Sequence, residues 1–278
     1  MTDQYAVVGD PIKHSLSPQI HRLFAQQTGQ DLHYTAKQVP LSEATIALRQ
    51  FFTQGGCGLN VTVPLKETAW QLVDVRVELA ERAGAVNTIM RQPDGQLHGY
   101  NTDGLGLVRD LTLNQGLDLN NLSILVLGAG GAVRGVLQPL LNLKPARLHI
   151  ANRTVSKAQA LESAFADIAQ QHTVDFSVMH YTNLQPAYDL VINGTSLSLQ
   201  GHRPDLPSGL LSSQGVVYDM VYSQSPTAFV QWGIEQGARA LDGRGMLIEQ
   251  AAAAFKIWRG VTPDTKAAFS LFNHSSDS

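Results

Sequence analysis

Cysteine, long apolar runs and blocks of like charge are all scarce in this chain of 278 residues. Cys57 is the only cysteine, which excludes an intrachain disulfide and a zinc site built from several cysteines. No apolar run approaches the ~20 residues that a membrane helix needs. The opening segment MTDQYAVVGDP has no basic stretch followed by a long apolar one, so we expect no secretory signal.

The charges and histidines exclude further classes of function. The net charge of −3 contains no charged block, so neither nucleic acid nor an anionic membrane is an expected partner. The histidines show no spacing typical of metal ligands, and we expect no metal site. With 44% hydrophobic and 15% charged residues, the composition is that of a globular protein, and the length favours two domains. We expect a cytoplasmic enzyme for a small-molecule substrate, either monomer or homodimer.

Short apolar segments alternate with stretches of helical periodicity along most of the chain. Ser17 followed by Pro18 predicts a helix N-cap with proline at the first helical position, and Pro93-Asp94-Gly95 predicts a tight turn. The alternation predicts an α/β fold with mostly parallel sheets covered by helices on both faces. The expected strands are residues 5–8, 32–39, 59–63, 86–90, 122–127, 147–151, 176–179, 190–193 and 216–219, with helices that include residues 42–52 and 246–258.

A glycine-rich turn follows the continuous apolar strand 122–127 and opens a helix. Strand, glycines and helix in this order are the context of a dinucleotide-binding turn. The first glycine permits the tight turn, and the second lets the backbone approach a pyrophosphate at the helix N-terminus. Val133 stands where the strict pattern has a small residue, so helix and strand should pack less closely there. An ordinary βα turn is the alternative. The turn reads Gly128-Ala129-Gly130-Gly131-Ala132.

The end of the next strand distinguishes the two nicotinamide cofactors. An NAD site places an acid there, about twenty residues on, against the ribose 2′-hydroxyl group. This chain has Asn152, Arg153 and Thr154 instead, with Lys157 one turn later. Because the guanidinium fork suits a 2′-phosphate, the sequence predicts NADP. The alternative is a solvated loop arginine, with Thr154 merely capping the following helix.

Two serines lie in the loop after the first strand. Ser15 and Ser17 offer hydroxyl groups beside the amides of a helix start, where the potential is positive. Together they would be able to hold a carboxylate. A single serine in such a place is more often an N-cap, and that alternative stays open for Ser17.

Further polar side chains occur at the ends of other strands. Asn60 and Thr62 share one face of a strand because side chains alternate. Lys66 follows at a helix start, where the helix dipole repels a cation and structure alone does not favour lysine. Asn87 begins another strand, and Asp103 supplies a carboxylate in a glycine-flanked loop. Each has an ordinary alternative as a turn amide, a cap or an exposed lysine.

Taken together, these motifs resemble those of the shikimate dehydrogenase family, whose members reduce 3-dehydroshikimate to shikimate. They occur in the family's order from Tyr5 to about Gly260, and four lie outside the generic nucleotide-binding fold. The resemblance implies NADP as cofactor and a role in chorismate and aromatic amino acid biosynthesis. The matching stretches are GDPIKHSLSPQIH, GLNVTVPLKE, RAGAVNTI, GYNTDG, LGAGGAVRG, ANRT, YDMVY and DGRGMLIEQAA.

The resemblance also implies two α/β domains with a cleft between them. The first, residues 1–103 with 244–278, would bind the substrate and carry the catalytic residues, and its C-terminal helix would fold back onto it. The second, residues 104–243, would be a doubly wound Rossmann domain that binds NADP.

Roles for single residues follow from the same resemblance. Ser15 and Ser17 would hold the substrate carboxylate, and Lys66 with Asp103 would form the catalytic pair and contact the substrate. The ring hydroxyl groups would be held by Asn60, Thr62, Asn87, Asp103 and Gln250, with Tyr222 completing the pocket. The cofactor would contact Gly128, Ala129, Gly130, Gly131, Ala132, Asn152, Arg153 and Thr154, with Met220 and Gly243 beside the nicotinamide.

Three places depart from the family's pattern. Residues 193–199 read NGTSLSL where N-A-T-S-x-G-M is usual, which bears on the loop over the cofactor and not on the activity. Val133 replaces the small residue common in the glycine fingerprint. Tyr100 precedes the NTD motif where members vary, so it is given no role.

A lysine and an aspartate from separate strand ends are able to bracket one oxygen atom. With NADPH supplying the hydride, the Lys66 ammonium would stabilise the developing alkoxide and would be able to donate the proton. Asp103 would hold the adjacent hydroxyl group. The residues leave open which of the two moves the proton.

Three other functions compete with this interpretation. Paralogues that use NAD and accept quinate often have an acid in place of Arg153, and whether quinate is accepted here stays open. A non-catalytic NADP- or shikimate-binding regulator would be free to lose Lys66 or Asp103, yet both are present. A methylenetetrahydrofolate-type dehydrogenase shares the two-domain plan but does not explain the paired serines with NVTVPLK and NTDG.

Overall fold

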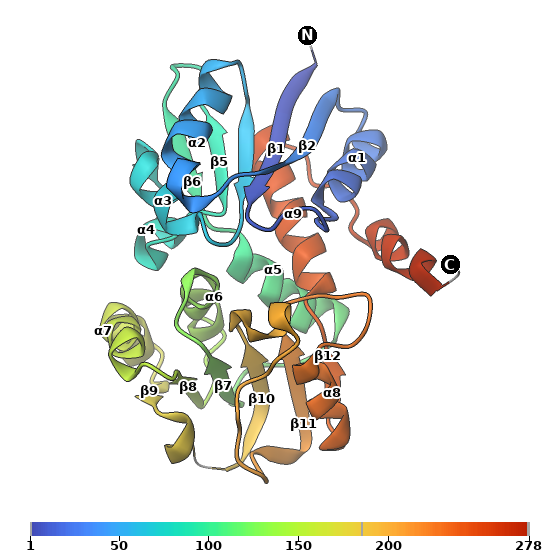
Figure 1. Cartoon of the computed structure of the whole chain (residues 1–278). Helices are drawn as coiled ribbons and strands as arrows, with labels where there is room; N and C mark the ends of the chain where they lie inside the picture. The colour runs from blue at the N-terminus through green and yellow to red at the C-terminus, as the bar shows by residue number, and fades with distance from the viewer. Residues whose placement is uncertain (1, 185, 277–278) are drawn as a thin grey trace. The chain divides into compact units, whose positions relative to one another are not determined.

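The computed structural model describes residues 2–184 and 186–276, and the chain divides into two compact units (Figure 1). The first unit comprises Met1–Gly106 with Leu247–Ser278, and the second comprises Leu107–Met246. The boundaries expected from the family resemblance are 103/104 and 243/244. Each unit has its own sheet and its own hydrophobic core. The expected α/β fold is confirmed.

The sheet of the first unit is mixed, in the order β2-β1-β3-β5-β6-β4. β1 runs parallel to β2 and β3, whereas β5 runs antiparallel to β3 and β6. The antiparallel pairing of β5 with β6 follows from the tight turn expected at residues 93–95, because such a turn returns the chain alongside the strand it has left. The strands are β1 (Asp3–Gly9), β2 (Leu32–Gln38), β3 (Gly58–Val61), β4 (Val75–Arg76), β5 (Thr88–Arg91) and β6 (Leu97–Tyr100).

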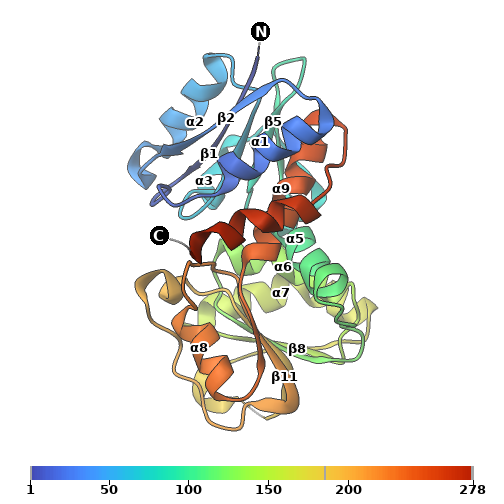
Figure 2. The same cartoon turned by 90° about the vertical axis from the view of Figure 1, so that its right-hand side faces the viewer.

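Helices cover both faces of this sheet (Figures 1 and 2). Ala6 and Val8 of β1 contact the core beneath α2, α3 and α4, whereas Tyr5 and Val7 on its other face belong to a cluster with Trp258 of α9. Phe24 of α1 also packs against α9, so the C-terminal helix packs on this unit as expected. The helices are α1 (Ser17–Thr28), α2 (Ala44–Thr53), α3 (Lys66–Leu72), α4 (Glu78–Ala83) and α9 (Arg244–Arg259), with 3-10 helices at Leu41–Glu43 and Lys266–Ser276.

Ser17 is not the N-cap of α1, and that prediction is wrong. The helix begins at Ser17 itself, Leu16 is the cap residue, and no side chain caps the first turn. Ser15 takes part in the turn instead, because its hydroxyl oxygen accepts a hydrogen bond from the Ser17 amide at 3.3 Å. The hydroxyl group of Ser17 is instead in hydrogen-bond contact with Tyr34.

The second unit has a sheet whose pairings are all parallel, in the order β12-β11-β10-β7-β8-β9. Counted from β7, this is the 3-2-1-4-5-6 order of dinucleotide-binding folds. Its strands are β7 (Ser123–Leu127), β8 (Arg147–Ala151), β9 (Asp175–Met179), β10 (Tyr188–Asn193), β11 (Leu211–Asp219) and β12 (Arg239–Leu241). Its helices are α6 (Gly131–Leu141), α7 (Val155–Gln171) and α8 (Ala228–Glu235), with 3-10 helices at Tyr181–Asn183 and Ser196–Gln200.

The apolar run of β7 is explained by burial on both faces. Ile124 and Val126 lie in the core under α6 and α7, whereas Leu125 and Leu127 lie in the core that contains Phe229 of α8. The expectation of a doubly covered parallel strand is confirmed here. The chain enters this unit through α5 (Asp103–Arg109) and a π-helical turn, Asp110–Asn114. Over the described residues, no helix combines the length and apolar character of a membrane span.

Burial within α2 gives a test of the first unit's core. Leu48→Ala should lower the free energy of unfolding by about 2–5 kcal/mol, because this side chain is fully buried and its loss leaves a cavity. Ile46 lies on the same helix with 72% of its surface exposed, so Ile46→Ala should stay within about 0.5 kcal/mol of wild type. Urea denaturation measures both, and equal losses would contradict this packing.

Candidate active site

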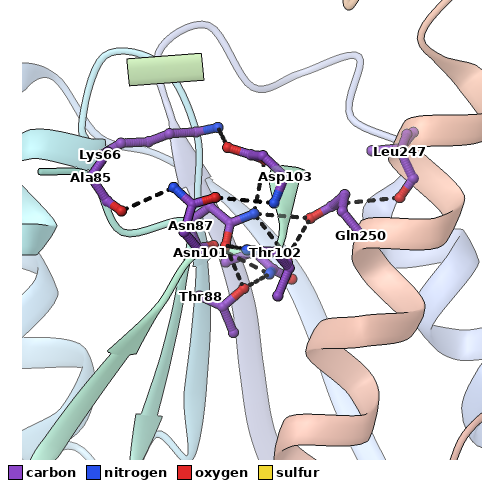
Figure 3. Close-up of polar contacts among 10 residues, drawn as sticks. Lys66, Ala85, Asn87, Thr88, Asn101, Thr102, Asp103, Leu247 and Gln250 are labelled. Atoms are coloured by element: carbon purple, nitrogen blue, oxygen red, sulfur yellow. Dashed lines mark hydrogen bonds and ion pairs between the residues drawn. The ribbon is translucent and has the colours of Figure 1, made fainter. Parts of the chain in front are cut away.

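Lys66 and Asp103 form an ion pair in the first unit (Figure 3). Nζ of Lys66 lies 2.5 Å from Oδ2 of Asp103. Lys66 is the first residue of α3, shortly after β3, and Asp103 is the first residue of α5, shortly after β6. The structure therefore brings together the two residues that the sequence singles out as a catalytic pair.

This pair explains the presence of a lysine at a helix start. The first turn of a helix is electrostatically unfavourable for a cation, and the side chain of Lys66 is only 11% exposed. The carboxylate of Asp103, itself 7% exposed, supplies the compensating charge. Removing one partner of a buried pair leaves the other charge uncompensated. Each residue is therefore required for the burial of the other.

The side-chain amide of Asn87 holds the other oxygen of Asp103. Its nitrogen donates to Oδ1 of Asp103 at 2.9 Å, while its oxygen accepts from the backbone amide of Thr102 at 2.9 Å. Asn87 is 2% exposed and lies immediately before β5. The carboxylate of Asp103 is thus fixed on one side by an ammonium and on the other by an amide.

The backbone at Asp103 is fixed by its neighbour Asn101. The Asn101 side-chain oxygen accepts from the amide of Asp103 at 3.1 Å, and its nitrogen donates to the backbone oxygen of Ala85 at 3.0 Å. Asn101 and Thr102 thus serve to place Asp103. In the sequence their only signal is the GYNTDG motif, from which no role for either residue was predicted.

Gln250 reaches the same cluster from α9. Its side-chain oxygen lies 3.4 Å from Nδ2 of Asn87 and 3.5 Å from Oγ1 of Thr102, and its nitrogen donates to the backbone oxygen of Leu247 at 3.0 Å. Packing of the C-terminal helix onto the first unit is what brings this residue, distant in sequence, beside Asn87 (Figure 3).

The remaining substrate residues expected in the first unit lie at strand ends or at the start of α1. Asn60 is 5% exposed at the end of β3, and Thr62 follows half-buried, with its methyl group against Gly9. Ser15 is half-buried and Ser17 is buried. Tyr222 is half-buried and belongs to the second unit, so its part in the substrate pocket stays a prediction.

The glycine turn of the second unit leaves the backbone amides at the start of α6 open. Gly128 has φ +108°, and a Cβ there would meet the backbone of Gly194 at 3.3 Å. Gly130 is the N-cap of α6, no side chain caps that helix, and a Cβ at Gly130 would meet nothing within 4 Å. The first amides of α6 are therefore uncapped beside open space, where an anion is favoured.

Gly194 explains how Val133 is accommodated in this turn. Val133 is fully buried, and a Cβ on Gly194 would meet its Cγ2 at 2.5 Å. Two departures from the family's pattern, a larger residue at 133 and a glycine at 194, are therefore complementary. A methyl group of Val133 occupies the space that is free because position 194 has no side chain.

The loop at residues 193–199 is held by the buried carboxylate of Asp219. Ser198, which stands at the family's glycine position, donates to Asp219 Oδ2 at 2.6 Å and accepts from Asn193 Nδ2 at 3.0 Å. Burial raises the pKa of Asp219, and hydrogen bonds from Ser198 and Thr227 act against that rise. In this chain the serine hydroxyl, rather than backbone freedom at a glycine, fixes the loop.

Arg153 follows β8 on the surface of the second unit. It is exposed. Burial raises the pKa of Tyr181, and the positive charge of Arg153 partly offsets that rise. Thr154 occupies the N-cap position of α7 without a side-chain capping bond, and Asn152 donates to its backbone oxygen at 2.8 Å. The alternative in which Thr154 serves as a side-chain cap is therefore not supported.

Met220 and Gly243 lie against each other in the second unit. A Cβ on Gly243 would meet the backbone oxygen of Met220 at 2.3 Å, so only glycine permits this approach.

Over the described residues, no group of three histidine, cysteine, aspartate or glutamate side chains is placed to hold a metal ion.

Comparisons with known proteins agree along most of the chain. Family models match as the shikimate dehydrogenase substrate binding domain at residues 7–89, shikimate / quinate 5-dehydrogenase at residues 110–200, and the shikimate 5′-dehydrogenase C-terminal domain at residues 243–268. Shikimate dehydrogenase (NADP(+)) of Alkalilimnicola ehrlichii is 55% identical over 95% of this chain and 96% of its own length. The corresponding protein of Marinobacter nauticus is 51% identical over 95% and 96%.

A solved structure shows the same likeness in three dimensions. The crystal structure of shikimate 5-dehydrogenase from Thermus thermophilus, in complex with NADP(H) and shikimate, matches with a TM-score of 0.85 at 32% identity. The match covers 98% of this chain and 99% of that one. With half of its residues shared with such relatives over nearly its full length, the chain belongs to the shikimate dehydrogenase family.

Proposed function

We infer that this protein is an NADP-dependent oxidoreductase that interconverts 3-dehydroshikimate and shikimate, and thereby serves chorismate and aromatic amino acid biosynthesis. The observation that carries this inference is the buried pair of Lys66 and Asp103, 2.5 Å apart and fixed by amides, in a member of this family. As an enzyme of biosynthesis acting on small molecules, it is proposed to work in the cytoplasm, as a monomer or a homodimer.

NADP fits the residues of the second unit. The uncapped amides of α6, beside the open space at Gly130, would hold the pyrophosphate, with Ala129, Gly131 and Ala132 lining the turn. Arg153, flanked by Asn152 and Thr154, would bind the 2′-phosphate, since no carboxylate stands there to repel it. Met220 and Gly243 would lie beside the nicotinamide. The bound cofactor supplies or accepts the hydride.

The first unit would hold the ring. Ser15 and Ser17 at the start of α1 would bind the carboxylate, where the helix dipole favours a negative charge. The ring hydroxyl groups would be bound by the polar side chains at the strand ends and on α9. These are Asn60, Thr62, Asn87, Asp103 and Gln250, with Tyr222 of the second unit as an additional contact.

Lys66 and Asp103 would manage charge at the reacting carbon–oxygen bond. As hydride reaches the carbonyl carbon, negative charge develops on the oxygen. An ammonium with N–H groups beyond the one given to Asp103 stabilises that charge and protonates the alkoxide. Asp103 would accept a hydrogen bond from the neighbouring hydroxyl group and keep the ammonium in place. Either member of the pair is able to carry the proton in the reverse direction.

The reaction itself is tested by absorbance. Mixing the protein with NADP and shikimate should raise absorbance at the band of the reduced nicotinamide. Binding of both compounds without any such rise would leave a binding protein in place of an enzyme. Parallel assays with quinate and with NAD define how strict the substrate and cofactor choice is.

Loss of the ammonium should affect turnover more than binding. Lys66→Ala is expected to lower kcat by about 10²–10⁴-fold with KM for shikimate nearly unchanged, because the charge it stabilises exists only in the transition state. Lys256→Ala, which removes an exposed lysine of α9, is the matched control and should change neither constant. A kcat for Lys66→Ala within threefold of wild type would end its catalytic role.

Loss of the guanidinium should separate the two cofactors. Arg153→Ala is expected to raise KM for NADPH by about tenfold or more while leaving the use of NADH nearly unchanged, because only NADPH carries the 2′-phosphate. Arg49→Ala removes an exposed arginine of α2 and serves as the control for net charge. Equal losses with both cofactors would refute the assignment of Arg153 to the 2′-phosphate.

A further inference from the structure

Two buried hydroxyl groups connect the side chains proposed to hold the substrate ring. They belong to Tyr34 on β2, which is 6% exposed, and to Thr88 at the start of β5, which is 0% exposed. Neither residue is among those assigned to substrate or cofactor above. Their hydrogen bonds nevertheless fix the orientation of two substrate-binding amides.

The first of these amides is that of Asn60. Its oxygen accepts from the Tyr34 hydroxyl at 2.7 Å, and its nitrogen donates to Oγ1 of Thr88 at 3.1 Å. The nitrogen also lies 3.4 Å from the backbone oxygen of Asn87, beyond the usual 2.7–3.2 Å. That weakly bound N–H is the part of the amide best able to turn to a substrate oxygen. Because the backbone oxygen of Asn87 only accepts hydrogen bonds, the nitrogen of the Asn60 side chain, and not its oxygen, must face it.

The second amide is that of Asn87, and Thr88 joins it to the first. Oγ1 of Thr88 accepts from Asn60 and donates to Oδ1 of Asn87 at 2.9 Å. The backbone amide of Thr102, which donates only, also binds Oδ1 of Asn87 and so settles the orientation of this amide. Its nitrogen is then directed to the carboxylate of Asp103 at 2.9 Å.

These bonds form a chain with one direction. Tyr34 donates to Asn60, Asn60 to Thr88, Thr88 to Asn87, and Asn87 to Asp103. Each donation polarises the next group, so the bonds strengthen one another in a buried site. The chain ends on the carboxylate that also binds Lys66. Among the five residues joined by these hydrogen bonds, only Tyr34 and Thr88, which contribute the two hydroxyl groups, have no proposed contact with the substrate.

The surroundings of Tyr34 keep it in the role of a donor. Its ring stacks on His21 with centroids 4.2 Å apart and tilts against Trp258 at 6.2 Å. Burial raises the pKa of Tyr34 well above its ordinary value of 10, and a hydrogen bond with Ser17 offsets part of that rise. The phenol therefore stays protonated. Burial also lowers the pKa of His21 to about 3, so its ring adds no charge.

We infer that Tyr34 and Thr88 are positioning residues: Tyr34 holds the oxygen of Asn60, and Thr88 couples the amides of Asn60 and Asn87, so that ring-hydroxyl recognition and the placement of Asp103 depend on both. This inference rests on the proposed function. Tyr34 acts through Asn60 and Ser17, which are both proposed to hold the substrate, and therefore on binding. Thr88 acts through both amides and therefore on binding and turnover.

Tyr34→Phe removes one oxygen and keeps the stacked ring. The expected result is a rise of about tenfold in KM for shikimate, with kcat within threefold and KM for NADP unchanged, because a buried amide loses its donor. Tyr5→Phe is the matched control: Tyr5 is a buried tyrosine of the same unit whose hydroxyl contacts Arg259 and not a substrate residue. It should leave all three constants unchanged.

Thr88→Val removes the bridging hydroxyl and keeps the shape of the side chain. KM for shikimate should rise and kcat should fall, each by about tenfold. Thr88→Ser, which retains the hydroxyl group, should restore both constants. A role in stability alone would lower the midpoint of thermal unfolding of these variants without this selective effect on shikimate over NADP.

A substrate analogue gives a second readout. Removing one of the ring hydroxyl groups that do not react should reduce kcat/KM of the wild type more than that of Tyr34→Phe, because the variant has already lost the fixed amide. Constants for shikimate within twofold of wild type in both Tyr34→Phe and Thr88→Val would overturn the inference. If the wild-type protein itself failed to oxidise shikimate, the proposed function would fail instead.

Discussion

The burial of opposite charges at Lys66 and Asp103 is the constraint on which the first unit depends. A lysine that begins a helix and is nearly removed from water is unfavourable unless a carboxylate lies against it. The carboxylate in turn needs a further donor, which the side-chain amide of Asn87 provides. The strand ends around this pair are therefore polar for an electrostatic reason, and the same arrangement is suited to a developing alkoxide.

The second unit is constrained by close backbone approach rather than by charge. Gly128 lies against the backbone of Gly194 where β7 and β10 end, which is the point at which the strand order reverses. The side chain of Val133 fills the space beside Gly194 that a Cβ at position 194 would need. The departures from the family's pattern at these two positions are thus local compensations.

Patterns of residues within a few positions of one another were the part of the fold that could be predicted from sequence. The apolar run of β7 and the glycines after it identify a dinucleotide-binding turn, because strand burial and backbone freedom are local requirements. The strands β4 and β12 were not expected, since two and three residues carry too little periodicity, and β6 was not expected either. Ser17 was wrongly predicted to be the N-cap. Two serines lie near the start of α1, and the sequence does not show which of them bonds to the backbone.

Residues that act through a long-range contact leave no comparable signal. Thr88 follows Asn87 in the motif RAGAVNTI, so its role could have been predicted from the sequence. Tyr34, by contrast, lies in a strand of ordinary composition. Its contact with Asn60 exists only because β1 pairs with β2 on one side and with β3 on the other, which brings residues 26 positions apart within 2.7 Å. A phenol in that register stays protonated and donates, whereas a charged group in its place would need a partner of its own. The sheet's pairing order thus decides which way the amides face, and through them where the carboxylate of Asp103 is held.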